Sequence, residues 1–371
     1  MNKKLISLLL SAALAVSMLT VPAFAAEGGE ADAALDETNE VVVTLGDTVT
    51  ASTVEDTDKA AADKTAADKA KTADSAPAAS TEKKQITYVA LGDSIVAGVG
   101  LADVKYAKDS TTLYSVDMSP NFKGYSPDCY VGKVATMMGL DHDHAINLGL
   151  PALTAPDLAD MVRDGQMPKM NMESGCWYKY PEFQDYIRKA DVVSVQIGSN
   201  DAFVPCIVAL GNATNWKSEA LAASVLAGDL RASGSPAAAL IQGIKDMHLT
   251  RDERNATWNL LTSEMGKICD RIYPQTTAGL ISVVQEIRKL NPDCQILLMG
   301  YTDPVPFVPC WHNYFKKLNK FEKQLAETYD LTYVAIPKAK TDLDVHPTIS
   351  GHEYIAKKIV NSIELAEDSA Q

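Results

Sequence analysis

The sequence predicts an α/β fold, a three-layer α/β/α sandwich with a mostly parallel sheet and a helical insertion. Short runs of apolar and β-branched residues alternate with stretches of helical spacing between about residues 86 and 366. Such alternation is typical of a parallel sheet that is covered by helices on both faces. In addition, several apolar runs end in Gly, Ser, Asn or Asp, at the strand ends where open α/β sheets place their functional sites.

The expected elements follow one another along the chain in strand–helix order. Strands are expected at 86–91, 144–148, 191–197, 295–299 and 331–335. Helices are expected at about 94–100, 277–290, 313–328 and 350–366, together with an apolar element at 129–138 and a long, mostly helical stretch after 197. The assignment of 277–290 depends on apolar residues at helical spacing, which Asn291-Pro292 then interrupts.

The beginning of the chain differs in composition from the rest. Lys3 and Lys4 precede a short apolar stretch and a small-residue cleavage pattern, which predicts a secretory signal peptide over residues 1–26. A transmembrane anchor needs a longer run, of about 20 apolar residues. Residues 27–84 hold no aromatic side chain and are rich in Ala, Asp, Glu, Lys and Thr, which predicts a disordered acidic linker. Residues 85–371 are then expected to form the main domain of a secreted, extracellular protein.

The net charge restricts the classes of partner. The chain carries a formal charge of −14 at pH 7, which argues against nucleic acid and anionic membrane surfaces as partners. No stable membrane anchor is expected, and we expect a monomer. Six cysteines in a secreted chain permit disulfides, and Cys206 with Cys310 is the favoured pair.

The most informative motif is Gly92-Asp93-Ser94, directly after the first expected strand. Gly92 permits a sharp turn, and Ser94 then lies near the free backbone N–H groups of a helix start. A hydroxyl held in this way suits a nucleophile that attacks a carbonyl carbon. By itself the tripeptide is more often a turn with a capping serine, so other residues must support the assignment.

Three further blocks follow expected strands: Asn147-Leu148-Gly149, Gly198-Ser199-Asn200 and Asp344-Val345-His346. The order Ser94, Gly149, Asn200, His346 resembles the GDSL family of esterases and lipases, the SGNH hydrolases, over about residues 85–365. The resemblance implies a serine esterase or lipase that hydrolyses carboxylic esters through an acyl-enzyme intermediate, with no metal or cofactor. The substrate it implies is a small-molecule, lipid or carbohydrate ester. Ser94 would be the nucleophile and His346 the base. The backbone N–H groups of Ser94 and Gly149 and the side-chain amide of Asn200 would form the oxyanion hole.

The sequence leaves open which group orients the ring of His346 as the third member of a catalytic triad. In many members of this family an Asp lies three residues before the His, where this chain has Leu343. Asp344 is the first choice to orient His346, Asp342 is the second, and a backbone carbonyl is the third. A group in this position fixes the tautomer of the ring and stabilises the imidazolium.

Two other functions are compatible with the same sequence. A carbohydrate O-acetylesterase of the same fold and a non-catalytic, surface-displayed binding domain are the alternatives.

His142 and His144 lie in an Asp-His-Asp-His run, which we interpret as a solvated loop because no further ligand spacing supports zinc. Residues 205–275 exceed what a minimal fold of the family needs, and whether they form a lid stays open.

Overall fold

The computed structural model describes residues 85–364, apart from 102, 105–121, 227–233, 305, 307 and 343–344. The predictions for the signal peptide and the linker, residues 1–26 and 27–84, therefore lie outside the described residues. Asp344 lies outside them as well.

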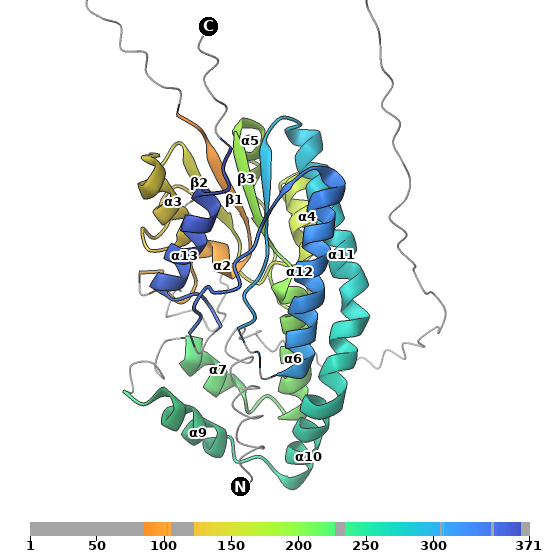
Figure 1. The fold of residues 1–371 in the computed structure, drawn as a ribbon. Coiled ribbons are helices and arrows are strands. Elements are labelled where there is room, and N and C mark those ends of the chain that lie inside the picture. The colour runs from red at the N-terminus through yellow and green to blue at the C-terminus, as the bar shows by residue number, and fades with distance from the viewer. Residues whose placement is uncertain are drawn as a thin grey trace, which may run out of the picture. The chain divides into compact units, whose positions relative to one another are not determined.

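A parallel sheet of five strands forms the centre of the molecule (Figure 1). Its strands are β1 Tyr88–Gly92, β2 Ala145–Gly149, β3 Val192–Gln196, β4 Gln295–Met299 and β5 Thr332–Val334, in the order β2-β1-β3-β4-β5. Every neighbouring pair is parallel. Gly92 pairs with Gly149 on one side and with Gln196 on the other, so the carboxyl ends of three strands are level.

Helices cover both faces of this sheet. One face packs against α2 Ser94–Ala97, α3 Tyr130–Met138 and α13 Ile349–Val360, and the other against α4 Ala155–Asp164, α5 Phe183–Lys189, α6 Ser199–Ala213, α11 Met265–Leu290 and α12 Pro309–Tyr329. Successive side chains of a strand point to opposite faces, and β1 shows the result. Val89 and Leu91 belong to the larger core cluster, whereas Tyr88 and Ala90 belong to the smaller one. The predicted three-layer α/β/α sandwich is confirmed.

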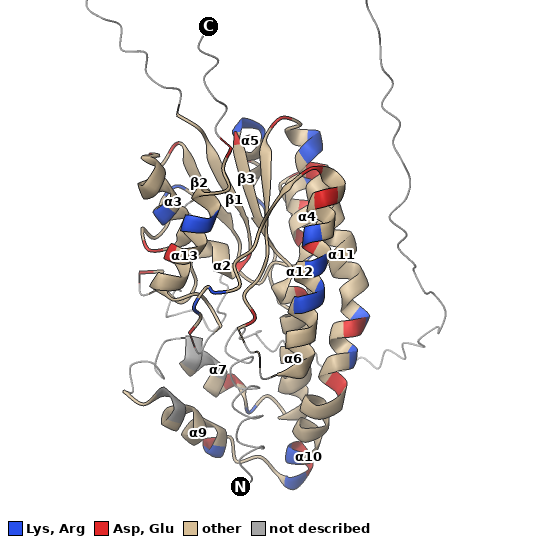
Figure 2. Cartoon of the chain, in the orientation of Figure 1, with Lys and Arg blue, Asp and Glu red and all other residues tan. Residues whose placement is uncertain are grey.

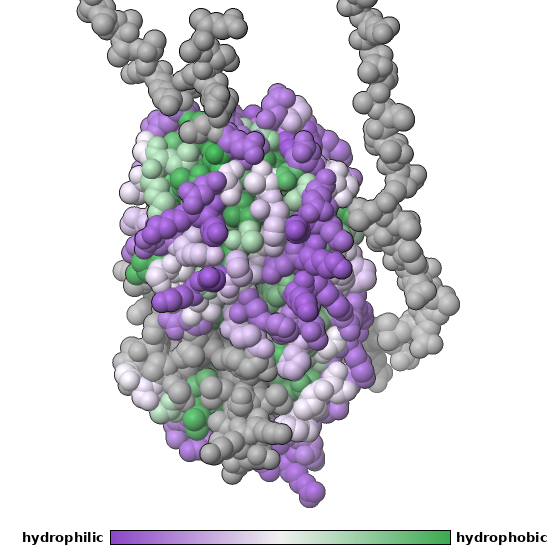
Figure 3. Space-filling model, viewed as in Figure 1, coloured by the Kyte–Doolittle hydropathy of each residue, from purple (hydrophilic) through white to green (hydrophobic). Residues whose placement is uncertain are grey.

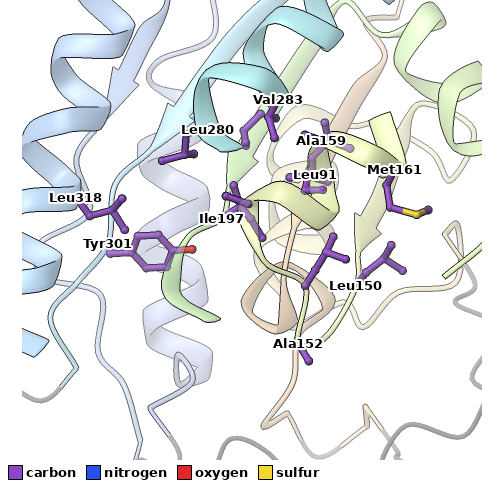
Figure 4. Packing of buried hydrophobic residues seen from close by; sticks show 14 of the residues in the cluster. Leu91, Leu150, Ala152, Ala159, Met161, Ile197, Leu280, Val283, Tyr301 and Leu318 are labelled. Atoms are coloured by element: carbon purple, nitrogen blue, oxygen red, sulfur yellow. The ribbon is translucent and has the colours of Figure 1, made fainter. Parts of the chain in front are cut away.

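The larger cluster lies between the sheet and the long helices. Figure 4 shows Leu91 and Ile197 at the strand ends close to Leu280 of α11 and Ala159 of α4. Burial of the apolar side chains of this cluster is the main favourable contribution to folding. The carboxyl ends of the strands therefore rest on a rigid, close-packed layer.

The long helix α11 begins at Met265, earlier than the predicted start at 277. It continues directly from α10 Arg251–Asn259 through a π-helical turn, η1 Leu260–Glu264. Pro274 lies inside it and removes one backbone donor. Met265 and Cys269 are nevertheless buried in the larger cluster, so tertiary packing extends the helix beyond its local sequence signal.

The predicted helical insertion is present between α6 and α11. In addition to α10 and η1 it contains α7 Glu219–Leu226 and α9 Pro236–Asp246. Leu221, Leu240 and Ile244 form a small cluster of their own, separate from the two core clusters. Figure 1 shows α7 and α9 beyond the carboxyl ends of the strands.

The outer helices are amphipathic. In α12 the side chains of Trp311, Phe315 and Leu318 are buried, whereas Lys316 and Lys320 are not. Figure 2 shows charged residues along the outer faces of α11 and α12, and Figure 3 shows the same surface as mainly hydrophilic. Within the described residues, no helix combines the length and the apolar character that a membrane span requires.

Candidate active site

Ser94 is the first residue of α2, at the carboxyl end of β1. Asp93 caps the helix, because its Oδ1 accepts a 2.9 Å hydrogen bond from the N–H of Ile95. Gly92 has a φ of +154°, and a Cβ at this position would lie 2.0 Å from the carbonyl oxygen of Gln196. Only glycine fits this turn, which fixes where the Ser94 hydroxyl lies.

The hydroxyl of Ser94 lies 2.9 Å from Nε2 of His346. Both side chains are largely buried, with 9% of Ser94 and 2% of His346 exposed. Ser94 and His346 are 252 positions apart in the sequence, so the fold brings them together. At this distance the ring can accept the proton of the hydroxyl, and the catalytic roles of the two residues stay predictions.

His346 lies in a tight loop before α13. The N–H of Asp342 donates to the carbonyl of His346 at 2.9 Å, and the N–H of Val345 donates to the carbonyl of Asp342 at 3.0 Å. Thr341 and Pro347 pair across the base of this loop. Val345 has a φ of +61°, which is unusual for a β-branched residue. These backbone contacts order the loop that carries His346, and the choice among Asp344, Asp342 and a carbonyl as the group that orients its ring stays a prediction.

We expect Asp344→Asn to lower kcat strongly and Asp342→Asn to have a mild effect. An Asn at the orienting position can hold the wrong tautomer of the imidazole, whereas a loop residue elsewhere has no such influence. Steady-state kinetics of the two variants and the double variant measure this. The reverse order would transfer the role to Asp342, and near wild-type activity in all three would favour a backbone carbonyl.

Asn200 is the second residue of α6 and lies at the carboxyl end of β3. Its side-chain Nδ2 donates to the carbonyl of Leu153 at 3.0 Å. An amide group has two protons, so this bond leaves one of them for a substrate oxygen. The bond also joins the β3–α6 junction to the loop between β2 and α4.

Gly149 ends β2, and its N–H donates to Oδ1 of Asn147 at 2.9 Å. A Cβ at Gly149 would lie 2.3 Å from the backbone nitrogen of Ala97. The glycine therefore allows β2 to approach α2 closely, and Asn147 strengthens the contact through Nδ2, which donates to the carbonyl of Val96 at 2.8 Å. For Gly149 to act in the oxyanion hole as predicted, its N–H would have to donate to the substrate oxygen as well as to Asn147.

Ala152 is a residue that the sequence analysis missed. It lies in the β2–α4 loop with a φ of +62° and is almost completely buried. Its neighbour Leu153 accepts the bond from Asn200. Within the described residues, the backbone N–H groups of Ala152 and Ser94 have no acceptor. No sequence signal marks this donor, because alanine rarely adopts a positive φ.

Asp93 connects three segments below the nucleophile. Its Oδ2 accepts hydrogen bonds from the hydroxyl of Ser199 at 2.7 Å and from that of Tyr301 at 3.2 Å. Burial raises the pKa of the Asp93 carboxyl, while these bonds and the nearby His346 act in the opposite direction. The residue therefore ties α2 to α6 and to the segment after β4.

Asp201 performs a similar function on the other side of Asn200. Its Oδ2 accepts a 2.9 Å bond from the N–H of Ala155, the first residue of α4. Burial raises the pKa of the Asp201 carboxyl to about 7. The group thus holds the start of α4 against α6 and changes its charge near neutral pH.

We expect Asp201→Asn to stabilise the protein above pH 7. Because the folded-state pKa is raised, the contribution of Asp201 to stability is fully present below about pH 4 and is lost as the pH rises through about 7. The neutral amide should remove this loss, on the order of 2–4 kcal/mol at pH 8, and have little effect near pH 4. Urea unfolding from pH 4 to 8 measures it, and an equal effect at all pH values would contradict the assignment.

A small pocket adjoins Ser94 and His346. Most of its lining is apolar, and its residues include Ile95, Phe203, Tyr301, Pro304, Phe315, Ile336, Ala339 and Val345. It lies between the segment after β4 and the loop that carries His346. The arrangement offers an apolar group of a substrate a place directly beside the hydroxyl of Ser94.

The histidine run at 142–144 is separate from this arrangement. Nδ1 of His144 contacts Oδ1 of Asp141 at 2.6 Å in a solvent-accessible turn. No group of three or more His, Cys, Asp or Glu side chains in the described part of the chain could hold a metal ion.

Comparisons with known proteins place the chain in a family. The search of curated proteins found no match. Among solved structures, a lipase from a goat rumen metagenome is 14% identical, with a TM-score of 0.42 over 75% of this chain and 97% of the other. Phospholipase A1 from Streptomyces albidoflavus has the same identity, TM-score and coverage of this chain, over 100% of its own. A carbohydrate acetylesterase from Sinorhizobium meliloti is 14% identical, with a TM-score of 0.40 over 74% of this chain and 97% of the other. The family model of the GDSL-like lipases and acylhydrolases matches residues 90–354, which is more than half of the chain, and the protein therefore belongs to this family.

Proposed function

We propose that this protein is a secreted serine esterase that hydrolyses carboxylic esters through an acyl-enzyme intermediate. The observation that carries the proposal is the 2.9 Å contact between the Ser94 hydroxyl and Nε2 of His346. It lies at the carboxyl end of a parallel strand, where α/β folds place their sites, and an apolar cavity adjoins it.

In the first half of the reaction, the hydroxyl of Ser94 attacks the ester carbonyl and His346 accepts its proton. His346 then protonates the leaving alcohol, and the acyl group stays on Ser94. In the second half, His346 accepts a proton from water, which attacks the acyl-enzyme. Ser94 leaves as the alcohol, receives its proton back from His346, and the acid is released.

The negative charge that develops on the carbonyl oxygen needs donors already in place. Ser94 N–H, the second proton of the Asn200 amide and, as the sequence predicts, Gly149 N–H are assigned to this role. We add the N–H of Ala152, because it has no acceptor among the described residues and adjoins the peptide that Asn200 contacts. Donors fixed by the fold need no reorganisation during the reaction, and each can stabilise the transition state by roughly 3–4 kcal/mol.

The cavity supports an ester with an apolar acyl or alcohol group. Phe203 and Phe315 contribute to its lining, as does Ile336, and burial of apolar substrate surface against them is favourable. A carbohydrate O-acetylesterase and a non-catalytic binding domain are the alternatives that the test must separate.

A fluorophosphonate probe tests the proposed activity directly. The probe should label the wild-type protein at Ser94, as peptide mapping would show, and should not label Ser94→Ala. Hydrolysis of p-nitrophenyl acetate, butyrate and octanoate should be compared with release of acetate from acetylated xylo-oligosaccharides. Activity confined to the oligosaccharides would favour the O-acetylesterase, and a folded protein without labelling or hydrolysis would favour the binding domain.

The secreted location is part of the proposal and is supported by the pattern of residues 1–26. The mature protein should begin at about residue 26 or 27, and residues up to about 84 should be sensitive to protease. Mass spectrometry of the exported protein and of limited digests measures both. A protected fragment that retains residues 40–84 would show that this segment is folded.

A further inference from the structure

Gln196 is a buried polar residue that the proposed mechanism does not use. It ends β3, lies opposite Gly92 of β1, and is only 1% exposed. Because successive side chains of a strand point to opposite faces, Gln196 lies on the same face of the sheet as Ser194, the face that α2 and α13 cover. Ser194 is paired there, because its hydroxyl shares a 2.7 Å hydrogen bond with that of Tyr88.

The side-chain amide of Gln196 is paired at one end only. Its Nε2 donates to the carbonyl of Gly300, just beyond the end of β4, at 3.3 Å. A carbonyl oxygen can only accept, so this bond fixes which end of the amide faces Gly300. Among the described residues no group donates to Oε1, although this atom is shielded from solvent. A buried carbonyl oxygen without a donor carries a desolvation cost, which a donor supplied by a ligand would remove.

The same residue lines the pocket that adjoins Ser94 and His346. Most of this wall is apolar, with Ile95 and Ile336 among its residues. In pockets of this kind, a small number of placed polar atoms decides which ligands fit. The unpaired oxygen of Gln196 is therefore a candidate for such a selecting atom.

The hydroxyl groups of the pocket wall give their protons to other parts of the protein. Ser199 and Tyr301 both donate to Oδ2 of Asp93, at 2.7 and 3.2 Å. Thr302 donates to the carbonyl of Ile336. Toward a ligand these three oxygens can only accept, as can the unpaired amide oxygen. The wall therefore favours a ligand group that brings a donor, such as a hydroxyl, over one that brings a carbonyl or ether oxygen.

We propose that Gln196 is a specificity-determining residue, whose Oε1 accepts a hydrogen bond from a hydroxyl group of the ester substrate. The hydroxyl belongs to the acyl or alcohol part that enters the pocket, and the rest of that part is apolar. This assignment rests on the proposed function, because it selects among esters. An ester without the hydroxyl leaves Oε1 unpaired in a pocket from which it excludes water, and the enzyme discriminates against that ester for this reason.

Two pairs of esters test the assignment and separate the acyl part from the alcohol part. The first pair is p-nitrophenyl butyrate and p-nitrophenyl 3-hydroxybutyrate, and the second is propyl butyrate and 3-hydroxypropyl butyrate. In one of the pairs, kcat/KM of the wild-type protein should be roughly 10- to 100-fold higher for the hydroxylated ester, after correction for the rates of alkaline hydrolysis. Release of p-nitrophenol or of acid measures the rates. Equal corrected values in both pairs would overturn the proposal.

Gln196→Met keeps the length of the side chain and removes its acceptor. It should abolish the preference by lowering kcat/KM for the hydroxylated ester, while the parent ester is hydrolysed at nearly the wild-type rate. Gln295→Met is the matched control, because Gln295 begins β4 and bonds to Thr332 and Ser362, and it should keep the preference. If Gln196→Met slowed all four esters by the same factor, the residue would orient the hydrolytic water or support the fold, and the proposal would be wrong.

The wild-type ratios decide the matter even if Gln196→Met does not fold. Labelling of Ser94 by the fluorophosphonate probe and hydrolysis of p-nitrophenyl butyrate report the proposed function separately. A labelled, active protein with equal ratios in both pairs would contradict the role of Gln196 alone. A folded protein without labelling or hydrolysis would contradict both the esterase function and this assignment.

Discussion

Ser94→Ala should lower kcat/KM for p-nitrophenyl butyrate by roughly 10⁴-fold or more, because no other group in the site can form the acyl-enzyme. The substitution removes a hydroxyl whose contact in the structure is His346, so the fold should be preserved. Stopped assays at high enzyme concentration measure the residual rate, and circular dichroism checks the fold.

A matched pair of variants makes this result specific. Ser282→Ala removes a hydroxyl from a partly exposed position of α11, where it donates to the carbonyl of Ala278, and should leave the activity unchanged. Ser94→Ala combined with His346→Ala should be little worse than Ser94→Ala alone, since the two residues act as a unit. If the folded Ser94→Ala variant retained most of the activity, Ser94 would not be the nucleophile.

Asn200→Ala should lower kcat by roughly 100- to 1000-fold with a modest change in KM. The amide donates to a charge that develops only in the transition state, so its loss affects the chemical step and not substrate binding. Its bond to the carbonyl of Leu153 is lost as well, and a small decrease in Tm should accompany the change in rate.

The control for this prediction lies in the same helix. Asn212 is an exposed residue near the other end of α6, and Asn212→Ala should retain wild-type kinetics. A defect of Asn200→Ala confined to KM would identify Asn200 as a binding residue. A loss of activity that follows the loss of Tm, and recovers at lower temperature, would indicate a structural role only.

The sequence by itself determined the layers, the strands and the positions of Ser94 and His346. These features are local: a strand is visible as a short apolar run, Ser94 stands where such a run ends in Gly-Asp-Ser, and His346 stands in a Pro-bounded loop before the last expected helix. The side chains of β1 alternate between the two core clusters, and this burial on both faces agrees with what a covered parallel sheet requires.

Only the tertiary structure decided the surroundings of the predicted donors and of the cysteines. The N–H of Gly149 is engaged by Asn147, and Ala152 adopts a positive φ that its residue type does not signal. The favoured cysteine pair, Cys206 with Cys310, is not bonded, because both residues are free thiols. The extension of α11 past Pro274 to Cys269 also has no local signal, because core packing there outweighs the local cost of proline. Contacts between residues far apart in the chain depend on how helices pack, and local patterns of residues carry no record of that packing.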